Sequence, residues 1–345
     1  MGKLSVGVLG ATGTVGQKLI TLLDEHPFFE VRELVASERS AQKPYREACN
    51  WKQETFIPRA VAELVVKSTD EPLESKILFS GLDSSVAGPV EENYAKAGHI
   101  VISNSKNHRM EPDVPLVIPE VNHDHLDLTK VQKRKGALIT NSNCSTMFLA
   151  MVLAPIQREF GIEAVHVTTM QAVTGAGYPG VASMDILGNV IPYIASEEEK
   201  MESETLKILG TLAGDHVIPA DFKVSAQCNR VAVYDGHTET LSIKLRKRAT
   251  PADLRACLEA FRGLPQELRL PTAPERPIIV FDEVDRPQPA RDVWKERGMA
   301  ACVGRIRPCP VFDVKMVIMG HNTIRGAAGA AILNGETYLK KGYLD

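Results

Sequence analysis

The stretch Leu4-Ser-Val-Gly-Val-Leu9, followed by Gly10-Ala-Thr-Gly13-Thr-Val-Gly16, decides the fold of the first third of the chain. The apolar residues predict a short β-strand, and residues 15–23 have the periodicity of an α-helix. A glycine-rich turn between a strand and a helix is typical of dinucleotide-binding loops, although the spacing differs from GxGxxG. Gly10 permits the tight turn, Gly13 allows close approach of a pyrophosphate, and Gly16 allows close helix packing. An ordinary glycine-rich turn is the alternative.

Strands and helices continue to alternate after this loop. We expect strands at 31–36, 77–80 and 99–102, and a helix at 86–97. This alternation predicts a doubly wound, Rossmann-type parallel sheet with helices on both faces.

The segment Ser37-Glu38-Arg39-Ser40, after the second predicted strand, indicates which dinucleotide binds. A cofactor without a 2′-phosphate favours an acid at this place, whereas hydroxyls and a guanidinium suit a phosphate. NADP is therefore favoured over NAD, with Glu38 as the contrary feature. The alternative for Arg39 is a solvated loop charge.

The pattern changes near residue 162, where longer alternating strands begin. Strands are expected at 164–172, 223–233 and 238–247, the last two joined across an Asp235-Gly236 turn, and two more around Arg307-Pro308. A helix is expected at 251–261. The sequence therefore predicts an α+β domain with a mixed, largely antiparallel sheet. An Ala- and Gly-rich helix at 322–341 is expected to return to the first domain. We predict an NADP-binding domain at 1–142, completed by 322–345, and a catalytic and oligomerisation domain at 143–321.

Length and composition limit the class of protein. The 345 residues suit two domains, and 44% apolar with 24% charged residues is ordinary for a soluble globular chain. A net charge of -3 without a basic patch argues against nucleic-acid and membrane-surface partners and favours small molecules. The start of the chain does not resemble a signal peptide, and no apolar run approaches the ~20 residues of a membrane span, so we expect a cytoplasmic protein. The six cysteines form no CxxC pair; we expect free thiols and no metal site.

Cys144 is the candidate nucleophile. It lies in Asn141-Ser-Asn-Cys-Ser-Thr146, directly before an apolar stretch, so capping residues place it in the first turn of a helix. Helix-start amides stabilise a thiolate and are expected to lower the thiol pKa from about 8.5 toward neutrality. Pro155 is expected to kink or end this helix. His237, after the Asp235-Gly236 turn, is a candidate base, and Arg230 a candidate carboxylate clamp. A structural cysteine and a surface arginine are the alternatives.

These residues belong to five ordered motifs through which the sequence resembles the aspartate-β-semialdehyde dehydrogenase family, particularly its archaeal and fungal branch. The resemblance runs nearly end to end. It is carried by GATGTVG at Gly10, SNCST around Cys144, QAVTGAGYPG from Gln171, EEEK from Glu197, and CNRVAVYDGHTE from Cys228 to Glu239.

The resemblance implies roles for particular residues. Cys144 would form a thioester, His237 would be the acid/base, and Gln171 would orient the reacting groups. Arg230 would bind the substrate α-carboxylate and Glu197 would lie near its α-amino group. The phosphate or acyl-phosphate oxygens would be held by Arg109, Asn143 and Lys200. On the cofactor side the resemblance implies Thr12, Thr14 and Val15 beside Gly10, Gly13 and Gly16; Ser37, Arg39 and Ser40; Ser80 and Asn104 along the cleft; and Gly175 and Asn322 near the nicotinamide.

The reaction implied is NADPH-dependent reduction of L-β-aspartyl phosphate to L-aspartate-β-semialdehyde and inorganic phosphate. This step serves the biosynthesis of lysine, threonine, methionine and isoleucine. An exposed sheet in the second domain suggests a homo-oligomer, with dimer and tetramer both open. Malonyl-CoA reductase and N-acetyl-γ-glutamyl-phosphate reductase are alternatives within enzymes. A non-catalytic NADP-binding sensor is the alternative from another class, although a sensor needs none of Cys144, Gln171, Arg230 and His237.

Overall fold

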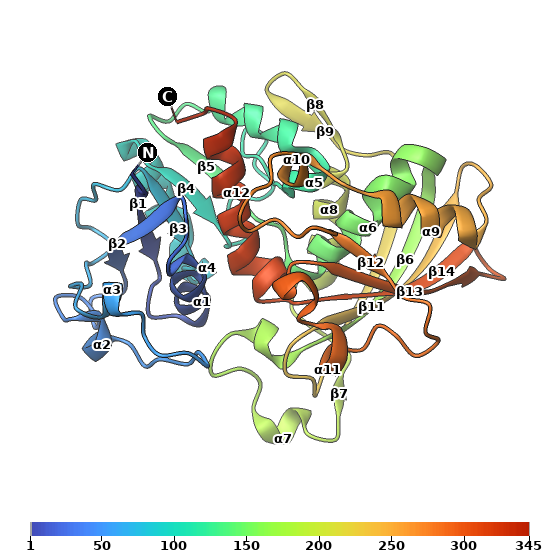
Figure 1. The fold of residues 1–345 in the computed structure, drawn as a ribbon, viewed down its shortest axis with the longest axis horizontal. Helices are drawn as coiled ribbons and strands as arrows, with labels where there is room; N and C mark the ends of the chain where they lie inside the picture. Colours follow the sequence, from blue (N-terminus) through green and yellow to red (C-terminus); the bar gives the residue numbers. More distant parts are fainter. Residues whose placement is uncertain (1, 345) are drawn as a thin grey trace.

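The first sheet has five parallel strands in the order β2-β1-β3-β4-β5 (Figure 1). The computed structural model describes residues 2–344. The strands are β1 (Leu4–Leu9), β2 (Phe29–Val35), β3 (Ile77–Ser80), β4 (Ile100–Ser103) and β5 (Ala137–Thr140). The four strands predicted here are confirmed, with ends shifted by at most two residues. The strand order reverses between β1 and β3, and such a switch point is where open α/β sheets bind ligands.

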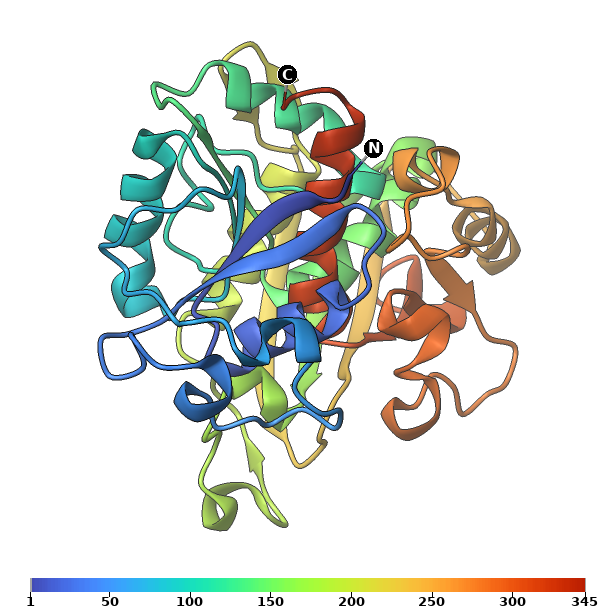
Figure 2. The same ribbon diagram turned by 60° about the vertical axis from the view of Figure 1, so that its left-hand side comes forward.

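Helices cover both faces of this sheet, as a doubly wound fold requires. On one face, α1 (Thr14–Leu23) and α12 (Gly329–Lys340) share a buried apolar cluster with β1, β2 and β3. On the other face, α4 (Ser84–Ala97) packs Tyr94 and Ala95 against the sheet. Figures 1 and 2 show α12 beside the first sheet, between the two halves of the molecule. Helix α12 packs against the first sheet, and its assignment to the first domain stays a prediction. Two short helices, α2 (Tyr45–Ala48) and α3 (Arg59–Ala62), complete this half.

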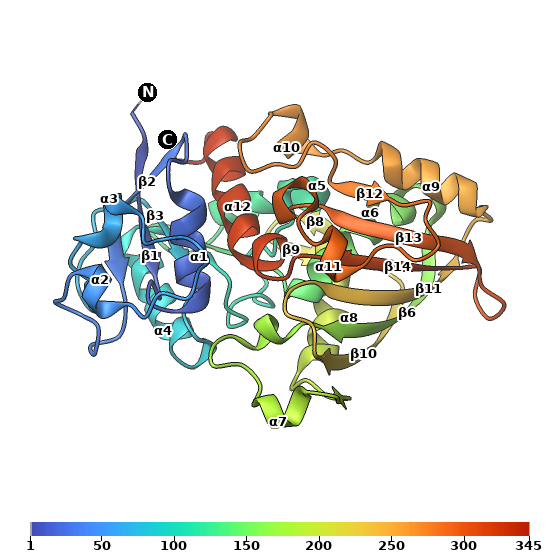
Figure 3. The ribbon, with the colours of Figure 1, turned by 60° about the horizontal axis from the view of Figure 1, so that its bottom comes forward.

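The second sheet has seven strands in the order β12-β13-β14-β11-β6-β10-β7 (Figure 3). Its strands are β6 (Ile162–Gln171), β7 (Val190–Ile191), β10 (Lys223–Val231), β11 (His237–Leu245), β12 (Ile278–Val280), β13 (Ala301–Pro308) and β14 (Val314–Gly320). Four of its six pairings are antiparallel and two are parallel, so the predicted mixed, largely antiparallel sheet is confirmed. A separate hairpin joins β8 (Thr211–Ala213) to β9 (His216–Ile218).

The predicted pairing of β10 with β11 across the Asp235-Gly236 turn is wrong. These strands are not neighbours, because β6 lies between them, parallel to β10 and antiparallel to β11. Five residues separate the strands, enough for the chain to step over the end of β6. This crossing places residues from three strands at one end of the sheet.

The helices of the second half cover one face of the seven-stranded sheet. The main ones are α6 (Cys144–Phe160), α8 (Glu197–Ile208) and α9 (Pro251–Ala260), which pack into one apolar core with β6, β11 and β14. Helix α6 starts where predicted and continues five residues past Pro155, because nearly all of its side chains are buried in this core. Shorter helices are α5 (Pro119–Asn122), α7 (Ser183–Ile186), α10 (Leu264–Glu267) and α11 (Pro289–Asp292), with 3-10 turns at His123–Lys130, Val173–Ala176 and Lys295–Gly298 and a π-helix at Ile324–Ala328.

The termini of the described chain lie near each other beside the first sheet, as Figure 1 shows. Within residues 2–344, no helix is both long and apolar enough to cross a bilayer. The boundary between the domains at residues 142 and 143 stays a prediction.

Candidate active site

One end of the second sheet carries three polar side chains on adjacent strands. Gln171 ends β6, and Arg230 of β10 is its register partner. His237 begins β11, whose next residue pairs with the residue before Gln171. All three are buried. The parallel β6–β10 pair and the antiparallel β6–β11 pair therefore place an amide, a guanidinium and an imidazole side by side.

Helix α6 brings the candidate nucleophile to this end of the sheet. Asn143 caps the helix, and its Oδ1 accepts hydrogen bonds from the Ser145 and Thr146 amides at 3.0 and 3.1 Å. Cys144 is the first residue after the cap, as predicted. Its Sγ lies 3.1 Å from Nε2 of His237. A thiol and an imidazole in direct contact are the pair that thiol-based covalent catalysis needs.

A buried carboxylate, Glu197, ties the capping residue to the sheet. Its Oε1 accepts hydrogen bonds from Asn143 at 2.8 Å and Gln171 at 3.0 Å. Its other oxygen pairs with Lys200, one helical turn along α8, at 2.5 Å. These three hydrogen bonds and the positive charge of Lys200 keep the pKa of Glu197 below its ordinary value, although burial acts to raise it. The side chains of Glu197 and Lys200 therefore both face the site.

Sequence reasoning missed Glu204, which holds another expected residue in place. The Glu204 carboxylate accepts hydrogen bonds from the Arg109 guanidinium at 2.9 Å and from the backbone N–H of Asn143 at 2.6 Å. Arg109 also donates to the Asn104 carbonyl at 2.7 Å, so much of its guanidinium is already engaged. The signal for Glu204 was present in the sequence. It follows Glu197 by seven residues, which places both on one face of a helix.

Two glycines make room for the reacting groups. A Cβ at Gly175 would lie 2.8 Å from the His237 ring and 2.9 Å from an Arg230 nitrogen, so only glycine fits. A Cβ at Gly326 would lie 2.8 Å from that of Cys144. Gly326 was not predicted. Asn322 accepts from the Gly236 amide at 2.9 Å and donates to Thr174 at 2.8 Å, which joins the turn before His237 to the loop that carries Gly175.

All eight residues expected for catalysis and substrate binding thus meet at one place, and comparisons with known proteins show the family of the chain. Residues 5–129 match the family profile "Semialdehyde dehydrogenase, NAD binding domain", and residues 153–325 match "Semialdehyde dehydrogenase, dimerisation domain". The aspartate-semialdehyde dehydrogenase of Methanothermobacter thermautotrophicus is 51% identical over 341 residues, covering 96% of this chain and 98% of that protein. The chain belongs to the aspartate-semialdehyde dehydrogenase family.

Two eukaryotic members are also similar over the whole length. The Schizosaccharomyces pombe enzyme is 49% identical, covering 98% of this chain and 99% of that protein. The crystal structure of the Candida albicans enzyme with NADP superposes with a TM-score of 0.91 at 44% identity, covering 99% of each chain. The resemblance to the archaeal and fungal branch is confirmed. The comparisons favour the aspartate-semialdehyde reaction over the malonyl-CoA, N-acetyl-γ-glutamyl-phosphate and sensor alternatives.

The nucleotide loop of this aspartate-semialdehyde dehydrogenase family member fits a dinucleotide. Gly10 has a φ of +74°, and a Cβ there would lie 2.8 Å from the Gly81 carbonyl across the switch point. A Cβ at Gly16 would overlap the Gly10 carbonyl. Helix α1 starts at Thr14 after Gly13, and no side chain caps it, so its first amides can receive phosphate oxygens. Thr12, Thr14 and Val15 are half-buried along this loop.

The other residues expected at the cofactor differ in exposure and in how many hydrogen bonds their side chains already make within the protein. Ser37 and Arg39 are exposed and Ser40 is half-buried, in a turn closed by the Ser40 amide on the Ser37 carbonyl at 2.9 Å. This turn follows β2, the neighbour of β1, as the prediction requires. Asn104 accepts from Asn141 at 2.9 Å and donates to the Ser80 carbonyl at 2.9 Å. The Ser80 hydroxyl donates to buried Glu91 at 2.6 Å and is not free for a ligand.

The expected low pKa of the Cys144 thiol is wrong for the site as it stands. Burial, with a smaller contribution from Glu197, raises this pKa to about 12, against the opposing effect of Lys200 and two arginines. Burial, with Arg230 nearby, lowers the pKa of His237 to about 3. Thiol and imidazole are therefore both neutral at pH 7.

A backbone contact sets which nitrogen of His237 carries the proton. The Ala172 amide donates to Nδ1 at 3.0 Å, so Nδ1 is an acceptor. A neutral imidazole has one N–H, which is then on Nε2 and points at Cys144. His237 thus faces the sulfur as a hydrogen-bond donor.

The thiol pKa predicts the pH dependence of Cys144 alkylation. The thiolate is the nucleophile, so below a pKa of about 12 its fraction rises with pH. We expect the alkylation rate of Cys144 by iodoacetamide to rise roughly tenfold per pH unit from about pH 7 to about pH 10. A small peptide thiol should level off near its pKa of about 8.5. The measurement is peptide mass mapping against time, and a plateau for Cys144 near neutral pH would contradict the prediction.

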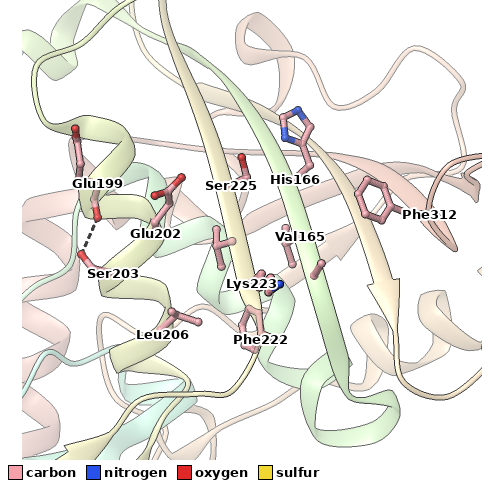
Figure 4. Close-up of a pocket in the computed structure, with 12 residues that line it drawn as sticks. Val165, His166, Glu199, Glu202, Ser203, Leu206, Phe222, Lys223, Ser225 and Phe312 are labelled. Atoms are coloured by element: carbon pink, nitrogen blue, oxygen red, sulfur yellow. Dashed lines mark hydrogen bonds between the residues drawn. The ribbon is translucent and has the colours of Figure 1, made fainter.

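The site is distinct from a surface hollow at the other end of the strands. Figure 4 shows this hollow between α8 and the sheet, where Val165, His166, Glu202, Phe222 and Ser225 line it. Its strand residues lie five to seven positions from Gln171 along β6 or from Arg230 along β10. Among residues 2–344, no three His, Cys, Asp or Glu side chains are grouped to hold a metal ion. All six cysteines are free, as predicted.

Proposed function

We propose that this chain reduces L-β-aspartyl phosphate to L-aspartate-β-semialdehyde and inorganic phosphate, with NADPH and a thioester on Cys144. The 3.1 Å contact between Cys144 Sγ and His237 Nε2 carries this proposal. The contact supports it because acyl transfer to sulfur requires a nucleophile and a proton donor at one carbonyl. The product feeds the biosynthesis of lysine, threonine, methionine and isoleucine.

The first half of the reaction uses the cations around Cys144. Lys200, Arg230 and Arg109 each favour the thiolate electrostatically. Because Nε2 of His237 already carries a proton, the thiol proton would pass to the departing phosphate, and Nε2–H would donate a hydrogen bond to the sulfur as it attacks the acyl carbon. The carbon–oxygen bond to phosphate breaks as the carbon–sulfur bond forms, and phosphate departs with the electron pair. Arg109, Lys200 and Asn143 are placed to stabilise its oxygens.

The second half turns the thioester into an aldehyde. Bound NADPH would supply the hydride for the thioester carbon, held at the loop from Gly10 to Gly16 with Ser37, Arg39 and Ser40 at the adenosine phosphate. His237 Nε2–H would then donate a hydrogen bond to the oxyanion of the hemithioacetal. On collapse this oxygen forms the aldehyde carbonyl while the carbon–sulfur bond breaks, and the released thiolate takes up a proton from solvent. Stabilisation of such an oxyanion is worth roughly 10²–10³ in rate.

The substrate has an anion at each end, which the site can match. Arg230 would bind the α-carboxylate through its planar guanidinium, and Glu197 would face the α-amino group. Gln171, bonded to Glu197, would orient the reacting carbonyl. Gly175 and Asn322 would border the nicotinamide, with Ser80 and Asn104 behind the cleft.

The activity is tested most directly in reverse. Purified protein is mixed with L-aspartate-β-semialdehyde and NADP, with and without inorganic phosphate, and nicotinamide reduction is followed by absorbance. We expect turnover that depends on phosphate and is much weaker with NAD. A protein that binds NADP but turns over only malonyl-semialdehyde with CoA would refute the proposed substrate.

For assembly, we infer that the open face of the seven-stranded sheet pairs with a second copy. The dimerisation profile covers this sheet, and outward residues of β10 and β11 such as Ser225, Gln227 and Thr240 are exposed on it. The resulting dimer could pair again as a tetramer. We place the protein in the cytoplasm, because free thiols suit a reducing compartment.

A further inference from the structure

Glu239 is a buried carboxyl group next to the reacting pair that has no role in the steps above. It lies two residues after His237 on β11, so both side chains are on the same face of the strand. This face packs against α6, the helix that begins with Cys144. Glu239 is fully buried, with Thr169 of β6 and Ile318 of β14 as its register partners on either side.

In the described part of the chain, no cation or amide is bonded to this carboxyl group. Within residues 2–344, neither Oε atom of Glu239 has a hydrogen-bond partner. The titratable groups that act on it or are affected by it are Glu197 of α8 and Cys228 of β10, and neither is a cation. An ionised carboxylate in such a place costs several kcal/mol or more, whereas a protonated one is tolerated. Burial and Glu197 both raise the pKa of Glu239 well above its ordinary value, in agreement with this argument.

The neighbours of Glu239 are hydroxyl groups that also lack partners. The Oγ atoms of Ser145 and Thr169 are fully buried and without a hydrogen bond in the described chain. Ser145 lies close enough to act on the pKa of Glu239, and it follows Cys144 directly. A carboxylic acid has one donor and several acceptor positions, so it can satisfy both hydroxyls after a small rotation. A buried polar atom that stays unpaired is destabilising, which favours this pairing.

We propose that Glu239 remains a neutral carboxylic acid and is a positioning residue, which joins Ser145 and Thr169 in a buried cluster that fixes the first turn of α6 against β11. Cys144 and His237 are on these two elements, so the cluster sets the distance between Sγ and Nε2. The inference rests on Cys144 and His237 acting as proposed above. Two carboxyl groups near the reacting pair then differ in protonation state because their surroundings differ. Glu197, paired with Lys200, stays ionised, and Glu239 stays protonated.

Two substitutions separate this role from an ionised one. Glu239→Gln keeps a neutral donor and acceptor of the same shape, and we expect kcat within about twofold of wild type with an unchanged pH profile. Glu239→Leu keeps the volume but removes the polar atoms, and we expect kcat to fall roughly 10²-fold with NADPH affinity unchanged, because small misplacements of reacting groups have effects of this size. Glu163→Gln, an exposed site on β6, is the matched control.

An infrared difference spectrum tests the protonation state without turnover. The spectrum of wild type minus Glu239→Gln at neutral pH should contain the carbonyl stretch of a protonated carboxylic acid. Its absence would overturn the neutral acid, as would a Glu239→Gln variant as impaired as Glu239→Leu. A fully active Glu239→Leu would overturn the positioning role. If instead wild type itself has no turnover in the phosphate-dependent assay, the proposed function fails while the infrared result still decides the state of Glu239.

Discussion

Replacement of Cys144 with alanine is expected to leave a folded protein that binds NADPH and has lost nearly all turnover. The sulfur is the group that would form the thioester, and Sγ lies 3.1 Å from Nε2 of His237. Loss of a nucleophile in comparable covalent enzymes lowers kcat by roughly 10⁴-fold or more. Cys144→Ser should be nearly as impaired, because an oxygen ester accepts hydride less readily than a thioester. The measurement is kcat in the phosphate-dependent assay, beside NADPH titration and thermal unfolding.

The controls for Cys144 come from the other cysteines. Cys257, half-buried on α9, lies away from the reacting groups, so Cys257→Ala should keep wild-type kcat. Acid quench during turnover should trap an acyl adduct on the Cys144 peptide of wild type alone, visible by mass. Substantial turnover of Cys144→Ala, or an adduct on another residue, would show that Cys144 is not the nucleophile.

The fold was largely predictable because its signals are local. The apolar strand before Gly10 and the periodic helix after it follow from residue spacing alone, and both are confirmed. Strand β5 (Ala137–Thr140) was missed because it directly follows the polar run before Gly136. The pairing of β10 with β11 was wrong because Asp-Gly is a strong hairpin signal. Which strand fills the space between them depends on contacts far apart in the sequence.

The site was predictable in its residues and less so in its electrostatics. The eight expected catalytic and substrate residues meet because a helix cap, two strand ends and a helix start each had a sequence signal. Glu204 follows Glu197 at a helical spacing, but its pairing with Arg109 could not be predicted, because the two residues are 95 positions apart. The thiol pKa was predicted in the wrong direction, since a sequence reveals the helix start but not the depth of burial, and burial determines this pKa.

Replacement of Arg230 with lysine is expected to weaken substrate binding strongly while leaving NADPH binding intact. One guanidinium nitrogen of Arg230 donates to the Ala172 carbonyl at 2.8 Å and lies close to Gly175. These contacts hold the guanidinium in place on the strand beside Gln171. Lysine keeps the charge but cannot bond the carbonyl and pair bidentately with a carboxylate at once. Loss of one hydrogen bond to a charged group costs about 1.5–3 kcal/mol, so KM for the semialdehyde should rise roughly 10- to 150-fold.

A substrate analogue can show which group of the substrate Arg230 contacts. An analogue of the semialdehyde without the α-carboxylate should react equally slowly with wild type and Arg230→Lys, because the contact that distinguishes them is gone from both. Arg32 is exposed on a strand of the first sheet, so Arg32→Lys is the matched control. It should leave KM unchanged for both the semialdehyde and the analogue. If Arg230→Lys lost NADPH affinity as much as substrate affinity, Arg230 would be acting on the cleft as a whole and the carboxylate role would be wrong.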